Sequence, residues 1–311
     1  MRPVLFFLLF AFLPGSAPMM AEEMRPAIMT SDDLAAFTYS TPDARIPYGE
    51  GPLQFADLRL PDGPGPFPVM ILIHGGCWLS EYDIHHIGKL ADAFTRSGIA
   101  TWTVEYRRVG DAGGGWPGTF QDIAQSANKM LSVADKYSLD TSRVIAAGHS
   151  AGGQLALWLA ASPQFHDNAL FSSARVVKLI GVLGLAPAPD LAYLYQTGVC
   201  EHVVDKLMGG SPTEFPERYA LGSPIELVPI GVPQLLVIGA YDDNWGPVGR
   251  RYFAAAEAAN DQVRLIEATQ SGHFEMIDPD SSTWPLVLDA AYQLLGMMGS
   301  EDGRGQSQVP E

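Results

Sequence analysis

The sequence predicts an α/β fold in which helices cover both faces of a mostly parallel sheet. Short apolar runs recur along the chain, and the run at 69–73 is apolar throughout, as expected for a strand buried on both faces. Segments of helical composition separate these runs, and this alternation favours right-handed crossovers between parallel strands. A chain of 311 residues that is 47% hydrophobic can bury one large core, so we expect one domain over 22–298.

The elements follow in order along this domain. Apolar runs and alternating patterns predict strands at 54–60, 69–73, 99–104, 144–147, 176–185, 233–240 and 263–267. Composition between turn signals predicts helices at 85–97, 119–137, 153–161, 254–260 and 284–295. Gly98 is expected to close the first of these helices.

Three segments depart from this alternation. Residues 22–52 are mixed and punctuated by proline, without clear periodicity. Residues 187–229, the cap segment, scatter proline, tyrosine and glycine between two core strands and favour one short helix at 201–208. An excursion of this length is typical of a cap or lid over a pocket, and a plain surface insertion is the alternative. The tail at 299–311, rich in glycine, glutamine and acidic residues, is expected to be disordered.

The amino terminus predicts a secretory signal peptide over 1–21. Met1-Arg2-Pro3 precedes an apolar stretch at 4–13 that is short for a membrane span, and a Pro-Gly-Ser-Ala break follows. Cleavage after Ala17 or Ala21 would leave a secreted or periplasmic protein without stable membrane insertion. Two alternatives stay open: an uncleaved anchor, and a cytoplasmic chain that starts at Met24 or Met29.

Charge and cysteine content limit the partners. The net charge of −16 and the pI near 4.7 argue against nucleic acid or anionic membranes. The chain lacks an H-E-x-x-H motif and metal-type Cys/His spacing, so we expect neither a metal nor a cofactor. Cys77 and Cys200 lie in different predicted loops. We favour two free, buried thiols, while a bridge is conceivable in an exported protein.

The pentapeptide Gly148–Gly152 predicts a nucleophilic serine. It follows a predicted buried strand and precedes an Ala/Leu-rich predicted helix. A tight strand-to-helix turn needs small neighbours, exposes the hydroxyl of Ser150 and points the N–H groups of the helix start at developing negative charge. A turn with a purely structural role is the alternative.

A serine nucleophile needs a base and an orienting acid, and the chain offers both after successive strands. Asp242 follows the strand that ends near 238, and His273 follows the strand that ends near 267. His273 would accept the proton of Ser150, and Asp242 would hold the imidazole, with Asp243 as the rival acid. His149 is expected to pack or hydrogen-bond beneath the turn rather than act as the base.

A glycine-rich strand exit supplies the expected oxyanion hole. Acyl transfer needs preorganised N–H donors, and we assign them to Gly75, Gly76 and Cys77 together with Ala151. A strand exit without catalytic duty is the alternative. Four aromatic residues, Trp78, Tyr82, Trp116 and Trp245, fall on loops expected near the same edge. We name two of them, Trp78 and Trp245, as candidate substrate contacts. Ordinary packing is an equally strong interpretation of these rings.

These motifs together resemble the α/β-hydrolase superfamily over roughly residues 55–295. They are His74-Gly75-Gly76-x-Trp78, Glu105-Tyr106-Arg107, Gly148-His149-Ser150-Ala151-Gly152-Gly153, Ser223-Pro224-Ile225, Gly239-x-x-Asp242 and Gly272-His273. Within it, the chain is similar to the esterase/lipase branch that contains kynurenine formamidase-like enzymes and bacterial acetyl- and feruloyl-type carboxylesterases. The resemblance implies an α/β-hydrolase fold with a small cap insertion.

The chemistry that these residues predict is hydrolysis of small carboxylic esters through an acyl-enzyme. Arylformamidase activity on an N-formylkynurenine-type amide would use the same residues, although a signal peptide argues against it. Peptidase activity and a non-catalytic, hydrolase-like binding protein are further alternatives. The oligomeric state and the acyl and alcohol preferences stay open.

Overall fold

A computed structural model describes residues 26–165, 167–171 and 177–297. The signal peptide expected over 1–21 and the tail at 299–311 lie outside these residues. Within these described ranges, eight strands form one sheet in the order β1-β2-β4-β3-β5-β6-β7-β8. Their bounds are β1 (Ala44–Pro47), β2 (Phe55–Arg59), β3 (Phe67–Ile73), β4 (Ala100–Val104), β5 (Leu139–His149), β6 (Gly181–Leu185), β7 (Gln234–Gly239) and β8 (Val263–Ala268).

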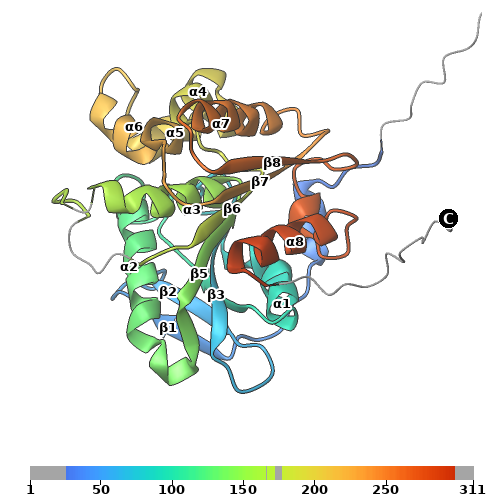
Figure 1. The fold of residues 1–311 in the computed structure, drawn as a ribbon. Helices are drawn as coiled ribbons and strands as arrows, with labels where there is room; N and C mark the ends of the chain where they lie inside the picture. The colour runs from blue at the N-terminus through green and yellow to red at the C-terminus, as the bar shows by residue number, and fades with distance from the viewer. Residues whose placement is uncertain (1–25, 166, 172–176, 298–311) are drawn as a thin grey trace, which may run out of the picture.

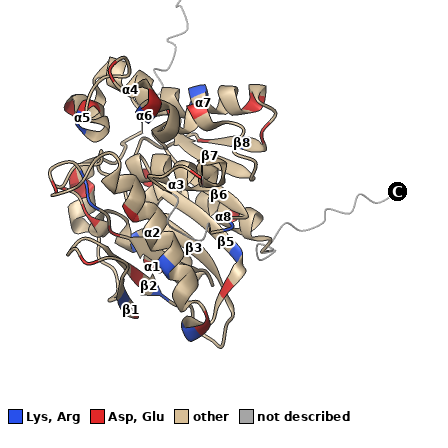
Figure 2. Ribbon diagram, turned by 90° about the vertical axis from the view of Figure 1, so that its left-hand side faces the viewer, with Lys and Arg blue, Asp and Glu red and all other residues tan. Residues whose placement is uncertain are grey.

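The sheet is parallel from β4 to β8, and only the β1–β2 and β2–β4 pairs are antiparallel. The strands β3, β6 and β7 contain no charged residue, whereas charged residues lie on helices, on loops and on the strands β1, β2, β5 and β8 (Figure 2). This pattern follows from burial on both faces, where an unpaired charge would be costly. The predicted α/β class with a mostly parallel sheet is confirmed.

Helices cover the two faces of the sheet as separate layers (Figure 1). Alternate residues of β3 divide between two apolar clusters. Val69 and Ile71 pack on the side of α2, α3 and α7, whereas Met70 and Leu72 pack on the side of α1 and α8. The bounds are α1 (Gly88–Arg96), α2 (Gly118–Val133), α3 (Ala151–Ala161), α7 (Gly246–Ala258) and α8 (Trp284–Leu295).

The cap segment holds more helix than the sequence pattern predicts. It contains α4 (Leu191–Thr197), α5 (Val199–Met208), α6 (Pro216–Gly222) and the 3₁₀ turn η5 (Pro224–Leu227), of which only the region of α5 was expected. These helices are grouped beside α7 (Figure 1). Among the described residues, none of the helices combines the length and apolarity needed to cross a membrane.

Several predicted boundaries differ from the observed ones. The strand predicted at 144–147 extends over the whole of β5, and the strand predicted at 176–185 begins only at 181. The helix predicted at 254–260 starts at 246, where Pro247 occupies the first turn and favours helix initiation. The region at 22–52, which lacks a clear pattern, contains the short η1 (Ser31–Ala36) and the edge strand β1.

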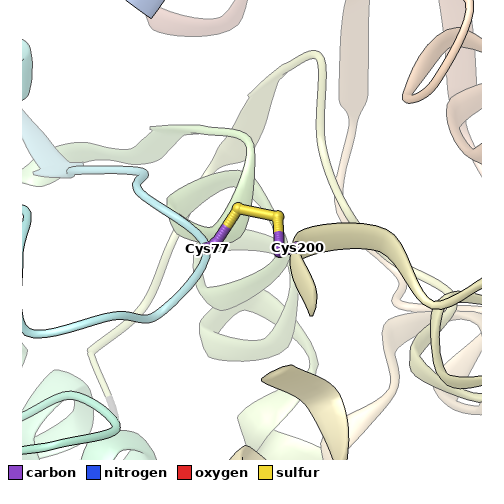
Figure 3. Close-up of a disulfide and its surroundings, with 2 residues drawn as sticks. All are labelled: Cys77 and Cys200. Carbon is purple, nitrogen blue, oxygen red and sulfur yellow. A yellow bond between two sulfur atoms is a disulfide. The ribbon is translucent and has the colours of Figure 1, made fainter. Parts of the chain in front are cut away.

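The two cysteines form a disulfide, and the prediction of free thiols was wrong. Cys77 lies in the loop after β3 and Cys200 lies at the start of α5, with their Cα atoms 6.1 Å apart (Figure 3). The two residues are separated by 123 positions in sequence. The proximity arises because the cap segment folds back over the carboxyl end of β3, which no local pattern announces.

Candidate active site

Ser150 occupies a strained turn between β5 and α3. Its φ of 54° and ψ of −117° lie outside the regions that non-glycine residues favour, at a cost of about 1–3 kcal/mol. The glycines around it are sterically required. A Cβ on Gly148 would lie 2.2 Å from the carbonyl oxygen of Gly152, and a Cβ on Gly152 would lie 2.1 Å from that of Ile73. The turn therefore depends on small residues on both sides of the serine.

The loops after β7 and β8 bring an acid and a histidine into contact. Nδ1 of His273 lies 2.7 Å from Oδ2 of Asp242, while the other carboxylate oxygen of Asp242 accepts a hydrogen bond from the backbone N–H of Trp245 at 2.9 Å. The carboxylate thus accepts a hydrogen bond from Nδ1–H of His273, so that Nε2 of the neutral ring carries the lone pair that can accept a proton. This contact places Asp242, rather than its rival Asp243, beside the imidazole.

A cavity of about 230 Å³ joins these parts of the site. Its lining includes Ser150, His273, Gly76, Cys77 and Trp245, which come from four different loops. Ser150 and His273 therefore line the same cavity. The cavity lies at the carboxyl ends of the parallel strands, where ligands bind in open α/β sheets.

The glycine-rich loop after β3 approaches the serine turn closely. A Cβ on Gly75 would lie 2.8 Å from the carbonyl oxygen of His149, and Gly76 adopts a φ of +101° that favours glycine. Within the described part of the chain, the N–H groups of Gly76, Cys77 and Ala151 donate to no protein acceptor. These amides belong to the loop and helix start that border the cavity, as the expected oxyanion hole requires.

A buried polar network around Glu105 supports this loop. Oε1 of Glu105 lies 3.3 Å from Nε2 of His74, and its Oε2 accepts from the backbone N–H of Ile84 at 3.0 Å. Burial raises the pKa of Glu105, but the hydrogen bond and charge of His74 and the charge of Arg108 outweigh it, so the pKa lies below its ordinary value. Glu105 is thus a carboxylate that anchors the loop.

The aromatic candidates divide between the cavity and the core. Trp245 lines the cavity and stacks on the imidazole of His273 with ring centroids 5.3 Å apart, and Tyr82 also lines it. Trp78 instead is 1% exposed, and its indole N–H donates to Gln154 at 3.0 Å. Trp116 packs edge-on against Phe120 and Phe171. The expectation that Trp78 contacts substrate is corrected, because its polar atom is satisfied inside the core.

Further residues line the cavity that the sequence did not predict as substrate contacts. They come from η1, the 3₁₀ turn η2 (Ile84–Ile87), the end of β5, the start of α5 and the loops beside Asp242 and His273, and they are Ser31, Leu34, His86, His149, Val199, Cys200, Asn244 and Phe274. The side chains of η1 come from the region that showed no periodicity. In the part of the chain that the structure describes, no three His, Cys, Asp or Glu side chains form a cluster able to hold a metal ion.

Comparison with solved structures shows the same fold in esterases. Esterase B from Lactobacillus rhamnosis superimposes with a TM-score of 0.69 at 20% identity, covering 85% of this chain and 89% of that chain. Esterase 2 from Thermogutta terrifontis with bound butyrate gives a TM-score of 0.66 at 16% identity, covering 84% and 96%. A bifunctional GH43-CE protein from Bacteroides eggerthii gives 0.66 at 20% identity over 80% of this chain, which spans only 37% of that protein.

Sequence comparison identifies the family. No curated protein sequence matches the chain. Residues 56–250, which are more than half of the chain, match the BD-FAE family of bifunctional acetyl/feruloyl esterases. This match spans the serine turn, the glycine-rich loop and Asp242, and the fold is the one expected for it. The chain therefore belongs to the BD-FAE family and is a carboxylic ester hydrolase with an α/β-hydrolase fold.

Proposed function

We propose that this esterase cleaves small carboxylic esters through an acyl-enzyme formed on Ser150. The single observation that carries the proposal is the Asp242–His273 contact of 2.7 Å, made by an imidazole that faces the same cavity as Ser150. A hydroxyl, an imidazole and a carboxylate in this arrangement are the groups that nucleophilic acyl transfer requires.

In the proposed acylation step, Oγ of Ser150 attacks the ester carbonyl carbon while Nε2 of His273 accepts the hydroxyl proton. The negative charge on the former carbonyl oxygen is stabilised by N–H groups of the loop at 75–77 and of Ala151. The imidazolium then donates its proton to the leaving alcohol as the C–O bond breaks. Asp242 holds the ring and stabilises its positive charge throughout.

Deacylation repeats these proton transfers with water. Nε2 of His273 accepts a proton from water, whose oxygen attacks the acyl carbon. The imidazolium then returns the proton to Oγ of Ser150 as the acyl–enzyme bond breaks. The products are a carboxylic acid and a regenerated serine.

The cavity supports a preference for a short or slender acyl group. Its volume is about 230 Å³, and its apolar wall includes Leu34, Val199, Trp245 and Phe274. Ligand pockets for drug-sized molecules span about 300–1,000 Å³, so the volume of this cavity is below that range. The similar Thermogutta esterase binds butyrate, which fits the same proposal.

We also propose that the protein works outside the cytoplasm. Disulfides persist in oxidising compartments, and the Cys77–Cys200 bond joins two walls of the cavity. This agrees with the signal peptide expected at 1–21. Mass spectrometry of the mature amino terminus of the native protein tests it: a start after residue 17 or 21 supports export, and a start at Met24 or Met29 contradicts it.

The enzymatic test compares Ser150→Ala with a matched control, Ser132→Ala, which removes an exposed hydroxyl on α2. The substrates are p-nitrophenyl acetate, butyrate and octanoate, methyl ferulate and, as the amide, N-formylkynurenine. We expect kcat of Ser150→Ala to fall about 10⁴-fold or more, with the control unaffected. Unchanged ester turnover by folded Ser150→Ala would overturn the proposal. Preferred cleavage of N-formylkynurenine would show that the substrate is a formamide rather than an ester.

A further inference from the structure

Two buried histidines connect the serine turn to the loop that carries the base. His86 belongs to η2, and His149 is the last residue of β5, directly before Ser150. Nε2 of His86 lies 2.8 Å from Nδ1 of His149, and Nε2 of His149 lies 2.9 Å from the carbonyl oxygen of His273. His86 is 8% exposed and His149 is fully buried. The proposed mechanism uses neither ring.

The contacts fix where the protons lie. A carbonyl oxygen can only accept, so the proton of His149 is on Nε2 and is donated to His273. In a neutral ring Nδ1 is then an acceptor, and it accepts from the Nε2–H of His86. Nδ1 of His86 consequently carries a lone pair, and this buried atom has no hydrogen-bond partner among the described residues. When both rings are neutral, only the Nε2–H tautomer of each satisfies both hydrogen bonds.

The surroundings keep both rings neutral. Burial is the main cause that lowers the pKa of His86, and together with the charges of His74 and His273, against an opposing effect of Asp83, it brings that pKa to about 3. Burial likewise lowers the pKa of His149 well below its ordinary value, with added repulsion from His273 and His86 and an opposing hydrogen bond to the His273 backbone. The pair therefore does not exchange protons near neutral pH, which suits a structural donor rather than a second base.

The position of His273 is restrained from several sides. Asp242 holds Nδ1 and Trp245 stacks on the ring, but both act on the side chain. His149 acts on the backbone, and its ring centroid lies 4.5 Å from that of His273. Because His149 directly precedes Ser150, one residue couples the backbone of the nucleophile to the backbone of the base. Displacements of about 1 Å in such a site can cost about 10²-fold in rate.

We propose that His149, held by His86, is a positioning residue that sets the distance between His273 and Ser150 by donating Nε2–H to the His273 carbonyl oxygen. This inference rests on the proposed function, because it assigns a role through His273. His86 fixes the orientation of the His149 ring and is the second member of the pair.

Substitutions of His149 separate donation from packing. In His149→Gln the amide nitrogen replaces Nε2 and can donate to the carbonyl, whereas His149→Asn replaces only the Nδ1 position, and His149→Leu removes both. We expect kcat to fall about 10- to 100-fold in the Asn and Leu variants, with KM within about threefold, and expect the Gln variant to recover most of kcat. The matched control is His85→Gln, whose side chain is 71% exposed.

The outcomes distinguish this inference from the proposed function. If the wild type hydrolyses esters, Ser150→Ala does not, and all His149 variants keep the wild-type kcat, the positioning role is wrong while the nucleophile stands. Equal loss of kcat in the Gln, Asn and Leu variants that remain folded by circular dichroism would also overturn it, since donation would then not matter. If the wild type does not hydrolyse esters, the proposed function itself fails.

The protonation of the two rings can be measured in the wild-type protein, and variants serve only to assign the signals. ¹⁵N-labelling of the histidine rings reports the tautomer and protonation of each of the 7 histidines. We expect two rings to stay neutral with the proton on Nε2 between pH 5 and 9, and expect their signals to vanish in His86→Gln and His149→Gln respectively. Titration of either ring in this range, or an Nδ1–H tautomer, would overturn the proposal.

Discussion

Loss of the Cys77–Cys200 disulfide should weaken both the fold and the site. The bond joins two residues that are 123 positions apart in sequence. Such a cross-link lowers the conformational entropy of the unfolded chain and thereby stabilises the fold. The chain-entropy relation for a loop of this length gives a stabilisation of about 5 kcal/mol at 25 °C. A loss of this size lowers the urea midpoint of unfolding by about 1–2 M for an m-value near 3 kcal/mol/M.

The same bond joins two walls of the cavity. Cys77 lies in the loop that carries the expected oxyanion donors, Cys200 lies in the first turn of α5, and both residues line the same cavity as Ser150. Without the bond the loop keeps its hydrogen bonds to Gln154 and Val109 and the support of Glu105, but it loses its link to the cap segment. We expect kcat to fall about tenfold, which is less than the roughly 10²–10³-fold that follows loss of an oxyanion donor itself.

The assay compares the wild type, with and without dithiothreitol, to Cys77→Ser/Cys200→Ser. Tryptophan fluorescence follows urea unfolding, and p-nitrophenyl acetate turnover gives kcat. Reduction should reproduce the double variant and should not affect the double variant itself. Thiol titration of the native wild type should find no free cysteine. Two free thiols in native protein, or an unfolding midpoint and kcat that do not depend on the bond, would contradict a stabilising role of this disulfide.

Three further changes test other parts of the site. Asp242→Asn removes the carboxylate that holds Nδ1 of His273, so kcat should fall about 10³- to 10⁴-fold by steady-state kinetics, while Asp243→Asn stays within a few-fold; equal losses would contradict the assignment. Gly76→Ala would place a Cβ 2.3 Å from Cβ of Tyr82 at a backbone φ of +101°. Thermal unfolding should therefore show a decrease in the free energy of unfolding of about 1–3 kcal/mol or more. Unchanged stability would mean that the site can accommodate a Cβ. The pKa of Glu105 in the folded protein lies below 4.5, so its carboxylate stabilises the fold above that pH, and this contribution is lost as the pH falls through the folded pKa. Glu105→Gln should therefore reduce the loss of unfolding free energy at acid pH. An unchanged pH dependence in this variant would argue against a role of Glu105 in acid unfolding.

The parts of the site that sequence could predict have local causes. Gly148 and Gly152 surround a serine because the turn leaves no space for a Cβ on either side. Asp242 and His273 follow apolar strands directly, and parallel strands bring their carboxyl ends to one edge of the sheet. Strand order and spacing were therefore enough to predict that these residues meet.

The remaining features depend on contacts between distant segments. Leu34 reaches the cavity from a region without periodicity, and Cys200 meets Cys77 only because the cap segment folds back. Trp78 shows the opposite error. It follows the glycine-rich loop like a substrate contact, but buried Gln154 accepts its N–H and also donates to the backbone of α6, so the ring lies in the core. No local pattern reports such a partner.

An acyl-enzyme on Ser150 can be tested directly by identifying the residue that reacts with a fluorophosphonate. Intact-protein mass spectrometry counts the adducts, and peptide mapping assigns them. The proposed mechanism predicts one adduct per chain, on Ser150, and its absence from Ser150→Ala and from denatured wild type. Modification of a different residue, or an unlabelled protein that still hydrolyses esters, would contradict an acyl-enzyme on Ser150.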